Sequence, residues 1–199
     1  GVVQRGYDLT NDFAEVIVEA KKGGLSGIQS LGITVGKPLK VMLALKVDGL
    51  AEGFDRCGEI SAMEYKLDGF RMQIHFDGKD VRLFTRRLED VTAQFPDVVE
   101  CVGKYVKGKK FIIDAEAVGF DAKTKKYLPF QMISQRIRRK YDIASMAKSL
   151  PVELNVFDVL FFEGKSMIDA PFSERRELLE KMVSNADRKL VLVEQLVTD

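Results

Sequence analysis

Residues 60–85 constrain the fold of this chain more than any other stretch. Two runs with the composition of β-strands are separated by a turn at Asp68-Gly69. In the second run apolar and polar residues alternate from Met72 to Phe76, which predicts a strand with one buried and one polar face. Asp77-Gly78 then predicts a two-residue hairpin into a third strand, so we expect an antiparallel sheet. The expected strands are 60–66, 70–76 and 81–85.

The remaining sequence mixes helical and strand patterns, which indicates an α+β fold. Apolar residues at helical spacing predict helices at 10–22, which Gly23-Gly24 ends, at 96–106 and 129–140, which each begin with a proline, and at 173–184. Ser173 is expected to cap the last of these helices. Continuous apolar runs predict strands at 110–120, 151–162 and 190–197. Gly36 and Pro38 favour an extended linker over 32–45.

Composition limits the classes of protein to consider. The chain has 199 residues with 46% hydrophobic content, enough for a sizeable core. Its 31 basic and 30 acidic residues nearly cancel, so net charge alone gives no indication of a nucleic-acid partner. Two distant cysteines and no long apolar run predict free thiols, an intracellular location and no membrane association.

Lys66 is the first candidate for chemistry. It ends an apolar run, where partial desolvation lowers the pKa of a lysine toward the neutral, nucleophilic amine. Arg71 brings a second cation nearby, which lowers such a pKa further and can hold a phosphate. This pattern indicates a nucleophilic lysine beside a phosphate ester. The alternative is a strand-turn-strand segment with ordinary solvated charges.

Asp114 and Glu116 are the second candidate. They are two positions apart in a predicted strand and therefore point to the same face. Buried carboxylates need a cation, a metal ion or hydroxyl donors. The alternative is a charge pair with lysines of the next strand. His75, the single histidine, has no second ligand at metal-binding spacing and is interpreted as structural or solvated.

Two basic runs and one aromatic residue have ambiguous patterns. Arg86-Arg87 follows a predicted strand and is typical of a solvated edge, although arginine also suits bidentate phosphate binding. The basic residues from Arg136 to Lys140 are as consistent with a solvated helix face as with a DNA contact. The periodicity around Phe157 indicates a core residue.

Lys66-x-Asp68-Gly69-x-Arg71 resembles the nucleotidyl-acceptor motif of DNA ligases, RNA ligases and mRNA-capping enzymes. Over the whole chain the sequence resembles ATP-dependent DNA ligases of the archaeal and eukaryotic replicative type. The resemblance implies a nucleotidyltransferase (ATP-grasp-like) adenylation domain, built of antiparallel sheets flanked by helices and incomplete at its C-terminal end. It also implies that residues 1–36 are the end of a DNA-binding domain with a linker, and that 37–199 are a partial adenylation domain.

The resemblance assigns a role to six residues, with Lys66 as the catalytic acceptor of AMP. Glu116 lies in an Asp-Ala-Glu run that matches the family's Asp-Gly-Glu element, with Ala115 in place of the usual glycine. It would hold the ribose and a metal ion. The implied nucleotide-binding residues are Glu64 at the adenine edge, Arg71 and Arg86 at the phosphate and sugar, Glu116 at the ribose, and Phe157 on the face of the base.

The resemblance also implies cofactors and partners. These are ATP, Mg²⁺ or Mn²⁺, nicked double-stranded DNA bound through the full-length protein, and a sliding clamp contacted through other regions. The family's Glu-Gly-x-Met-x-Lys and Lys-x-Lys strands are not found in this sequence. We therefore expect a partial active site and little or no nick sealing by this chain alone. The alternatives are a non-catalytic nucleotide- or DNA-binding fragment, and an RNA ligase or capping-type nucleotidyltransferase.

Overall fold

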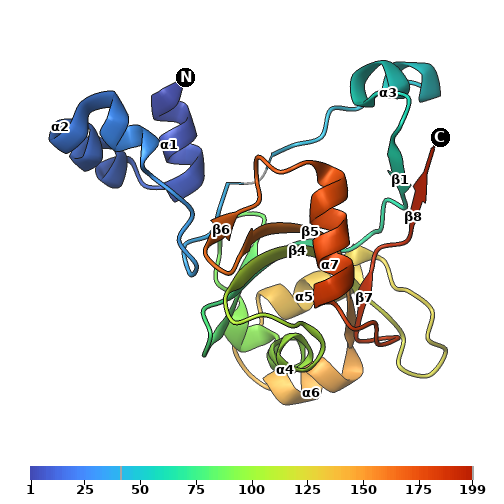
Figure 1. Ribbon diagram of the computed structural model, residues 1–199. Coiled ribbons are helices and arrows are strands. Elements are labelled where there is room, and N and C mark those ends of the chain that lie inside the picture. Colours follow the sequence, from blue (N-terminus) through green and yellow to red (C-terminus); the bar gives the residue numbers. More distant parts are fainter. Residues whose placement is uncertain (41, 199) are drawn as a thin grey trace.

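The computed structural model describes residues 1–40 and 42–198, and its centre is a curled six-stranded sheet (Figure 1). The strand order is β3-β2-β4-β5, and both β6 and β7 pair with the outer edge of β5. All pairings are antiparallel except that of β5 with β7. The α+β class and the antiparallel sheet are thus confirmed. The strands of this sheet are β2 (Phe70–Phe76), β3 (Val81–Thr85), β4 (Phe111–Gly119), β5 (Val152–Phe162), β6 (Lys165–Ser166) and β7 (Leu190–Leu192).

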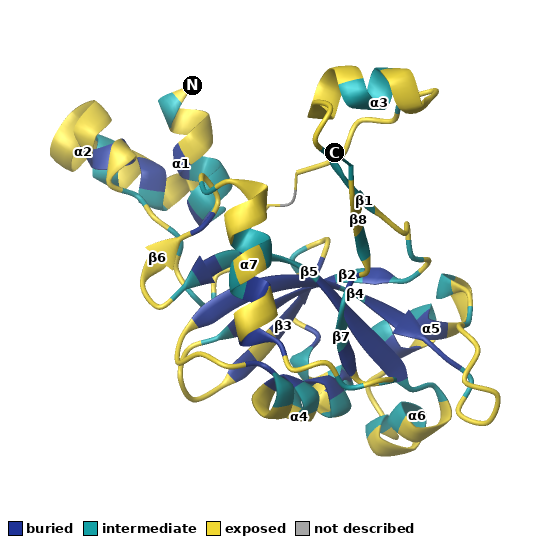
Figure 2. Ribbon diagram, turned by 45° about the vertical axis from the view of Figure 1, so that its right-hand side comes forward, coloured by how far each residue is buried: buried dark blue, intermediate teal, exposed yellow. Residues whose placement is uncertain are grey.

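Several helices pack against this sheet, the first two helices of the chain pack mainly on each other, and a small second sheet stands apart from the main one (Figure 1). The antiparallel pair of β1 (Ala62–Glu64) and β8 (Gln195–Val197) rises from the body near the C-terminus (Figure 1). Figure 2 shows the main sheet as largely buried and the outward faces of the helices as exposed. The helices are α1 (Val2–Thr10), α2 (Phe13–Gln29), α3 (Leu50–Cys57), α4 (Pro96–Tyr105), α5 (Phe130–Ile137), α6 (Ile143–Ser149) and α7 (Phe172–Met182), with a 3₁₀ turn at Thr92–Gln94.

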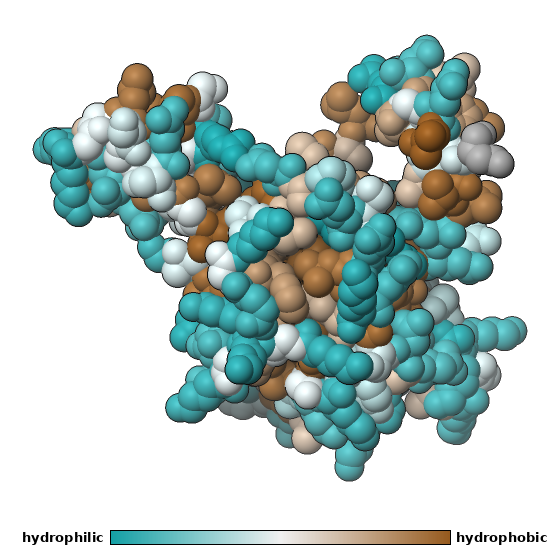
Figure 3. Space-filling model, viewed as in Figure 1, coloured by the Kyte–Doolittle hydropathy of each residue, from teal (hydrophilic) through white to brown (hydrophobic). Residues whose placement is uncertain are grey.

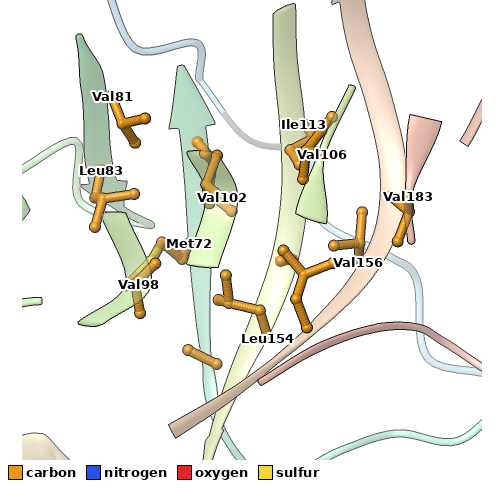
Figure 4. Packing of buried hydrophobic residues seen from close by; sticks show 14 of the residues in the cluster. Met72, Val81, Leu83, Val98, Val102, Val106, Ile113, Leu154, Val156 and Val183 are labelled. Carbon is orange, nitrogen blue, oxygen red and sulfur yellow. The ribbon is translucent and has the colours of Figure 1, made fainter. Parts of the chain in front are cut away.

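The main hydrophobic core lies on one face of the sheet. Alternate residues of the central strands, such as Met72 of β2 and Ile113 of β4, are fully buried there. Val98 and Val102 of α4 pack into the same cluster, close to Met72 (Figure 4). Burying such side chains contributes about 1.5–3 kcal/mol each to folding. This core holds the strands in a fixed register and so fixes the side chains on the opposite face.

The opposite face of the sheet is divided between the linker and an open cleft. The register pairs Arg71 with Glu116 at one end of this face and His75 with Ile112 at the other. Leu39 of the linker packs against Ile112.

Gln73 and His75 were expected on a polar, open face, and that expectation is wrong. Both are at most 2% exposed because the linker covers them. The Leu39 N–H donates to Gln73 Oε1 at 2.7 Å, and the Gly36 N–H donates to His75 Nδ1 at 2.9 Å. The structural interpretation of His75 is confirmed.

Several expected elements have different limits. The run 60–66 forms only the three residues of β1, and 190–197 divides into β7 and β8, which belong to different sheets. Ser173 lies inside α7 and does not cap it. The hairpin between β2 and β3 has a four-residue turn, 77–80.

The N-terminal region also differs from the sequence expectation. Helix α2 leaves helical geometry at Gly24, where the sequence predicted its end, but continues to Gln29. The sequence patterns did not predict helices α1, α3 and α6. In the described residues Cys57 and Cys101 are free, and no helix there has the length and apolar character to cross a membrane.

Apolar side chains remain exposed around α3 and the β1–β8 pair. Figure 3 shows hydrophobic residues at the surface of this lobe. The most exposed of them include Leu50, Ile60, Leu196 and Val197.

Candidate active site

One open cleft of about 1460 Å³ unites the six residues that the sequence singled out. They come from five separate segments: β1 and the turn after it, β2, the turn after β3, β4 and β5. The sheet brings these segments together although the residues span nearly a hundred positions of the sequence. The six that line the cleft are Glu64, Lys66, Arg71, Arg86, Glu116 and Phe157.

Lys66 lies in the turn between β1 and β2, and its side chain is exposed to the cleft. The expectation that this lysine ends a strand and is partly desolvated there is wrong, because β1 ends at Glu64 and Lys66 is exposed. The turn is held by Asp68, whose Oδ2 accepts the N–H of Phe130 at 3.3 Å. The first residue of α5 is thereby linked to the segment that carries Lys66.

Gly69 allows this turn to approach strand β4 very closely. A Cβ atom at Gly69 would lie 2.4 Å from the carbonyl oxygen of Ala117 and 3.1 Å from Cγ of Glu116. Real Cβ atoms do not come so close to a backbone oxygen, so only glycine fits here. The close approach keeps Lys66 beside the carboxylate of Glu116.

Glu116 is a carboxylate that the protein partly desolvates. Burial raises its pKa to about 7, while Lys66, the Gly69 N–H and Arg71 act in the opposite direction. A nearby cationic ligand favours the ionised form of such a group. Glu116 is therefore suited to bind a cation or a hydroxyl group in the cleft.

Arg71 of β2 is the cross-strand neighbour of Glu116 of β4, and it forms an ion pair with Asp114. Their ion pair joins β2 to β4, with the Asp114 side chain fully buried and Arg71 26% exposed. Burial raises the pKa of Asp114, and the charge of Arg71 opposes this rise. The buried carboxylate therefore has a cation as its partner, but this cation is an arginine of β2 rather than a lysine. Arg71 Nε is buried and has no hydrogen-bond partner among the described residues.

Phe157 reaches the cleft because β5 contains a β-bulge. The register pairs Ala115 with Val156 and Asp114 with Asp158, which leaves Phe157 without a partner on β4. Bulges re-aim side chains and are common next to active sites. The ring is only partly buried, and the Arg71 guanidinium lies 5.5 Å from its centroid. The periodicity of β5 predicted that Phe157 is a core residue. This prediction is wrong, because the bulge turns Phe157 toward the cleft.

Glu64 and Arg86 occupy exposed parts of the cleft wall. Glu64 ends β1 and accepts a hydrogen bond from the side-chain amide of Gln195 at 2.7 Å. Arg86 lies in the turn after β3, and its exposed guanidinium has no acidic partner within the described residues.

Arg136 is neither solvated nor a DNA contact, contrary to both readings of the basic helix. Its side chain is fully buried, makes a bidentate ion pair with Asp97 at 2.5 and 3.0 Å, and donates to the carbonyls of Gln94 and Leu150. It also stacks 4.3 Å from the centroid of Phe95. The sequence hardly distinguishes this buried arginine from its neighbours, because Arg136 belongs to a run of basic residues. Its structural role is to fix α5 as one wall of the cleft.

The cleft fits a divalent metal ion only together with a ligand. Among the described residues no three His, Cys, Asp or Glu side chains are grouped as a metal cage. Mg²⁺ does not require such a cage, since it is usually bound by one or two carboxylates, water and substrate phosphates. Glu116 is the carboxylate suited to this role.

Comparisons with known proteins identify the family of the chain. Residues 41–199 match the family model described as ATP dependent DNA ligase domain. The DNA ligase of Nanoarchaeum equitans is 50% identical over 190 residues, which are 96% of this chain and 34% of that protein. The DNA ligase of Methanopyrus kandleri is 42% identical over 198 residues, or 100% of this chain and 35% of that protein. The chain thus spans about a third of the length of these curated relatives.

One solved structure supports the fold alone. The protein described as Pmar-Lig_Pre aligns with a TM-score of 0.56 and 14% identity, over 96% of this chain and 40% of that chain. Because the family model matches most of the sequence and the relatives are archaeal DNA ligases, the chain belongs to the family of ATP-dependent DNA ligases.

Proposed function

We propose that Lys66 accepts AMP from ATP in the first step of DNA ligation. The nitrogen of its neutral amine attacks the α-phosphorus, a nitrogen–phosphorus bond forms as the nitrogen releases a proton to solvent, and the bond to pyrophosphate breaks. The observation that carries this proposal is the single cleft in which Lys66 faces two arginines, a carboxylate and an aromatic ring. Such a transfer depends mainly on positioning and on stabilising phosphate charge.

Each cleft residue has a role that its chemistry suits. Phe157 offers a ring face on which adenine stacks, and Glu64 lies where it can accept a hydrogen bond from the base. Arg71 and Arg86 provide guanidinium donors for the phosphate and the sugar. Glu116 holds the ribose and a divalent ion. A bound Mg²⁺ or Mn²⁺ would supply charge neutralisation at the phosphates.

The later steps belong to the whole protein. AMP passes from Lys66 to the 5′-phosphate at a DNA nick, and the 3′-hydroxyl then displaces it to seal the strand. In this proposal residues 1–36 are the end of a DNA-binding domain with its linker, and 37–199 belong to the adenylation domain. A sliding clamp as partner and an intracellular location stay predictions. The expectation that this chain alone seals few or no nicks also stays a prediction.

The experiment is an intact mass measurement after incubation with ATP and Mg²⁺. We expect the protein to gain one AMP and the Lys66→Ala variant to gain none. Lys79→Ala, which changes an exposed lysine of the β2–β3 turn, is the matched control and should still gain AMP. A gain of AMP by Lys66→Ala, or no gain by the unchanged chain, would contradict the proposal.

A further inference from the structure

Three cations line the cleft in addition to the residues assigned above. Arg87 follows Arg86 in the turn after β3, and Arg138 and Lys140 follow the last turn of α5. All three side chains are exposed. The intervening Arg139 does not line the cleft. It donates to the carbonyl of Tyr141 at 2.9 Å and pairs with Asp142 at 3.4 Å.

The charges of these three residues are not neutralised by neighbouring acids. Within residues 1–40 and 42–198, no carboxylate pairs with any of them. Glu89 and Asp90 line the same cleft, but they accept hydrogen bonds from threonine hydroxyls, at 3.4 Å from Thr85 and 2.6 Å from Thr92. The cationic side chains thus remain available to an anionic ligand.

Helix α5 sets the distance between these cations and Lys66. Its first N–H contacts Asp68, two residues beyond Lys66, and Arg138 is its C-terminal cap. Eight helical residues span about 12 Å. The Gln94 side chain donates to the carbonyl of Ile137 at 3.5 Å, which links the 3₁₀ turn Thr92–Gln94 to this end of the helix. Arg138 and Lys140 therefore lie about one helix length from the lysine turn, and Arg87 lines the same cleft.

This separation fits a nucleic-acid strand better than the polyphosphate of ATP. The γ-phosphate is only two bridging oxygens away from the α-phosphorus that Lys66 attacks, so it stays near the lysine. One strand of a duplex presents a phosphate about every 3.4 Å along its axis, so about 12 Å corresponds to three or four nucleotides. Lysine and arginine contacts of this kind position a duplex without reading its sequence.

We propose that Arg87, Arg138 and Lys140 form a phosphate-backbone track, which holds the DNA strand a few nucleotides from the nick while its terminal phosphate lies at Lys66. This inference rests on the proposed function, because it assigns the far end of the same cleft to the DNA substrate. The buried Arg136 makes the track possible: by anchoring α5 to Asp97, it fixes the helix end from which Arg138 and Lys140 extend.

The test is binding of a fluorescent nicked duplex, with a 3′-hydroxyl and a 5′-phosphate, measured by anisotropy over a range of salt concentrations. The variants are Arg87→Gln and the double change Arg138→Gln with Lys140→Gln. We expect weaker binding, and a slope of log K against log salt that becomes less negative by about 0.9 for each cation removed. The loss should be the same for duplexes of unrelated sequence. Arg139→Gln is the matched control from the same basic run and should keep the original slope.

Four outcomes would overturn the track. These are no measurable binding by the unchanged chain, an equal change of slope in Arg139→Gln, an unchanged slope in the track variants, or a preference for duplex RNA of the same sequence.

The same proteins are assayed for lysine–AMP formation by mass. Loss of AMP transfer without loss of DNA affinity would assign these cations to the nucleotide. If instead the unchanged chain forms no lysine–AMP but the track variants lose DNA affinity, the proposed function fails and the track stands.

Discussion

Arg71 and Asp114 form an ion pair in which the carboxylate is fully buried and the guanidinium reaches the cleft. The pair joins two neighbouring strands and places Arg71 5.5 Å from the ring centroid of Phe157. Asp114 does not line the cleft, so its contribution to a ligand passes through Arg71. It is a positioning residue for the phosphate-binding arginine.

Changing Asp114 should weaken both the fold and ATP binding. Asp114→Asn keeps the size of the side chain but removes the ion-pair partner of Arg71. We expect a loss of about 1–3 kcal/mol in the free energy of unfolding, because removing one partner of a buried pair is costly and Arg71 is still partly solvated. ATP affinity, measured by calorimetry, should fall roughly tenfold, or about 1.4 kcal/mol. Asp187→Asn, at a side chain that is 91% exposed, is the control and should change neither quantity.

Gly69→Ala should disrupt the lysine turn. The added methyl group would meet the Ala117 carbonyl, a backbone atom that cannot rotate away, so the turn must move away from β4. We expect a loss of about 1–3 kcal/mol of stability from this overpacking, together with a fall in the rate of lysine–AMP formation.

Gly103→Ala provides the matched control for this change. A Cβ atom at Gly103, inside α4, meets nothing within 4 Å. Alanine should therefore stabilise the protein by up to about 1 kcal/mol through its helix propensity. Urea unfolding and intact mass measure the two effects. Equal behaviour of the two alanine variants would contradict the close approach at Gly69.

His75 should make the fold sensitive to acid. Burial, followed by the charge of Arg82, lowers its pKa from 6.5 to about 3. The neutral imidazole accepts the N–H of Gly36, so its contribution to stability is complete above pH 6.5 and is lost as the pH falls toward 3. One proton taken up on unfolding corresponds to a slope of about 1.4 kcal/mol per pH unit.

The measurement compares urea unfolding of the protein and of His75→Gln between pH 7 and pH 4, which covers most of the interval between the ordinary histidine pKa of 6.5 and the pKa of about 3 in the fold. We expect the variant to be less stable near neutral pH and the difference to shrink as the pH falls. Parallel stability curves for the two proteins would show that His75 is not the group that titrates.

The central strands of the sheet, and the six residues proposed for the site, follow from the amino-acid sequence alone. Alternating or continuous apolar residues located β2, β4 and β5 almost to the residue, because burial on a sheet imposes a period of two. The resemblance of Lys66-x-Asp68-Gly69-x-Arg71 to a nucleotidyl-acceptor motif pointed to the lysine turn and to Arg71 of β2, which both line the cleft. All six residues inferred from the sequence line that cleft.

Contacts between distant segments determine which charged and polar side chains are covered. Gln73 and His75 are buried because a distant linker packs on their face, and Arg136 is buried because Asp97 and two carbonyls surround it. Lys66 is exposed because its strand stops early. Periodicity reports which residues share a face of an element. What lies against that face depends on contacts between segments far apart in the chain, and these have no local signature.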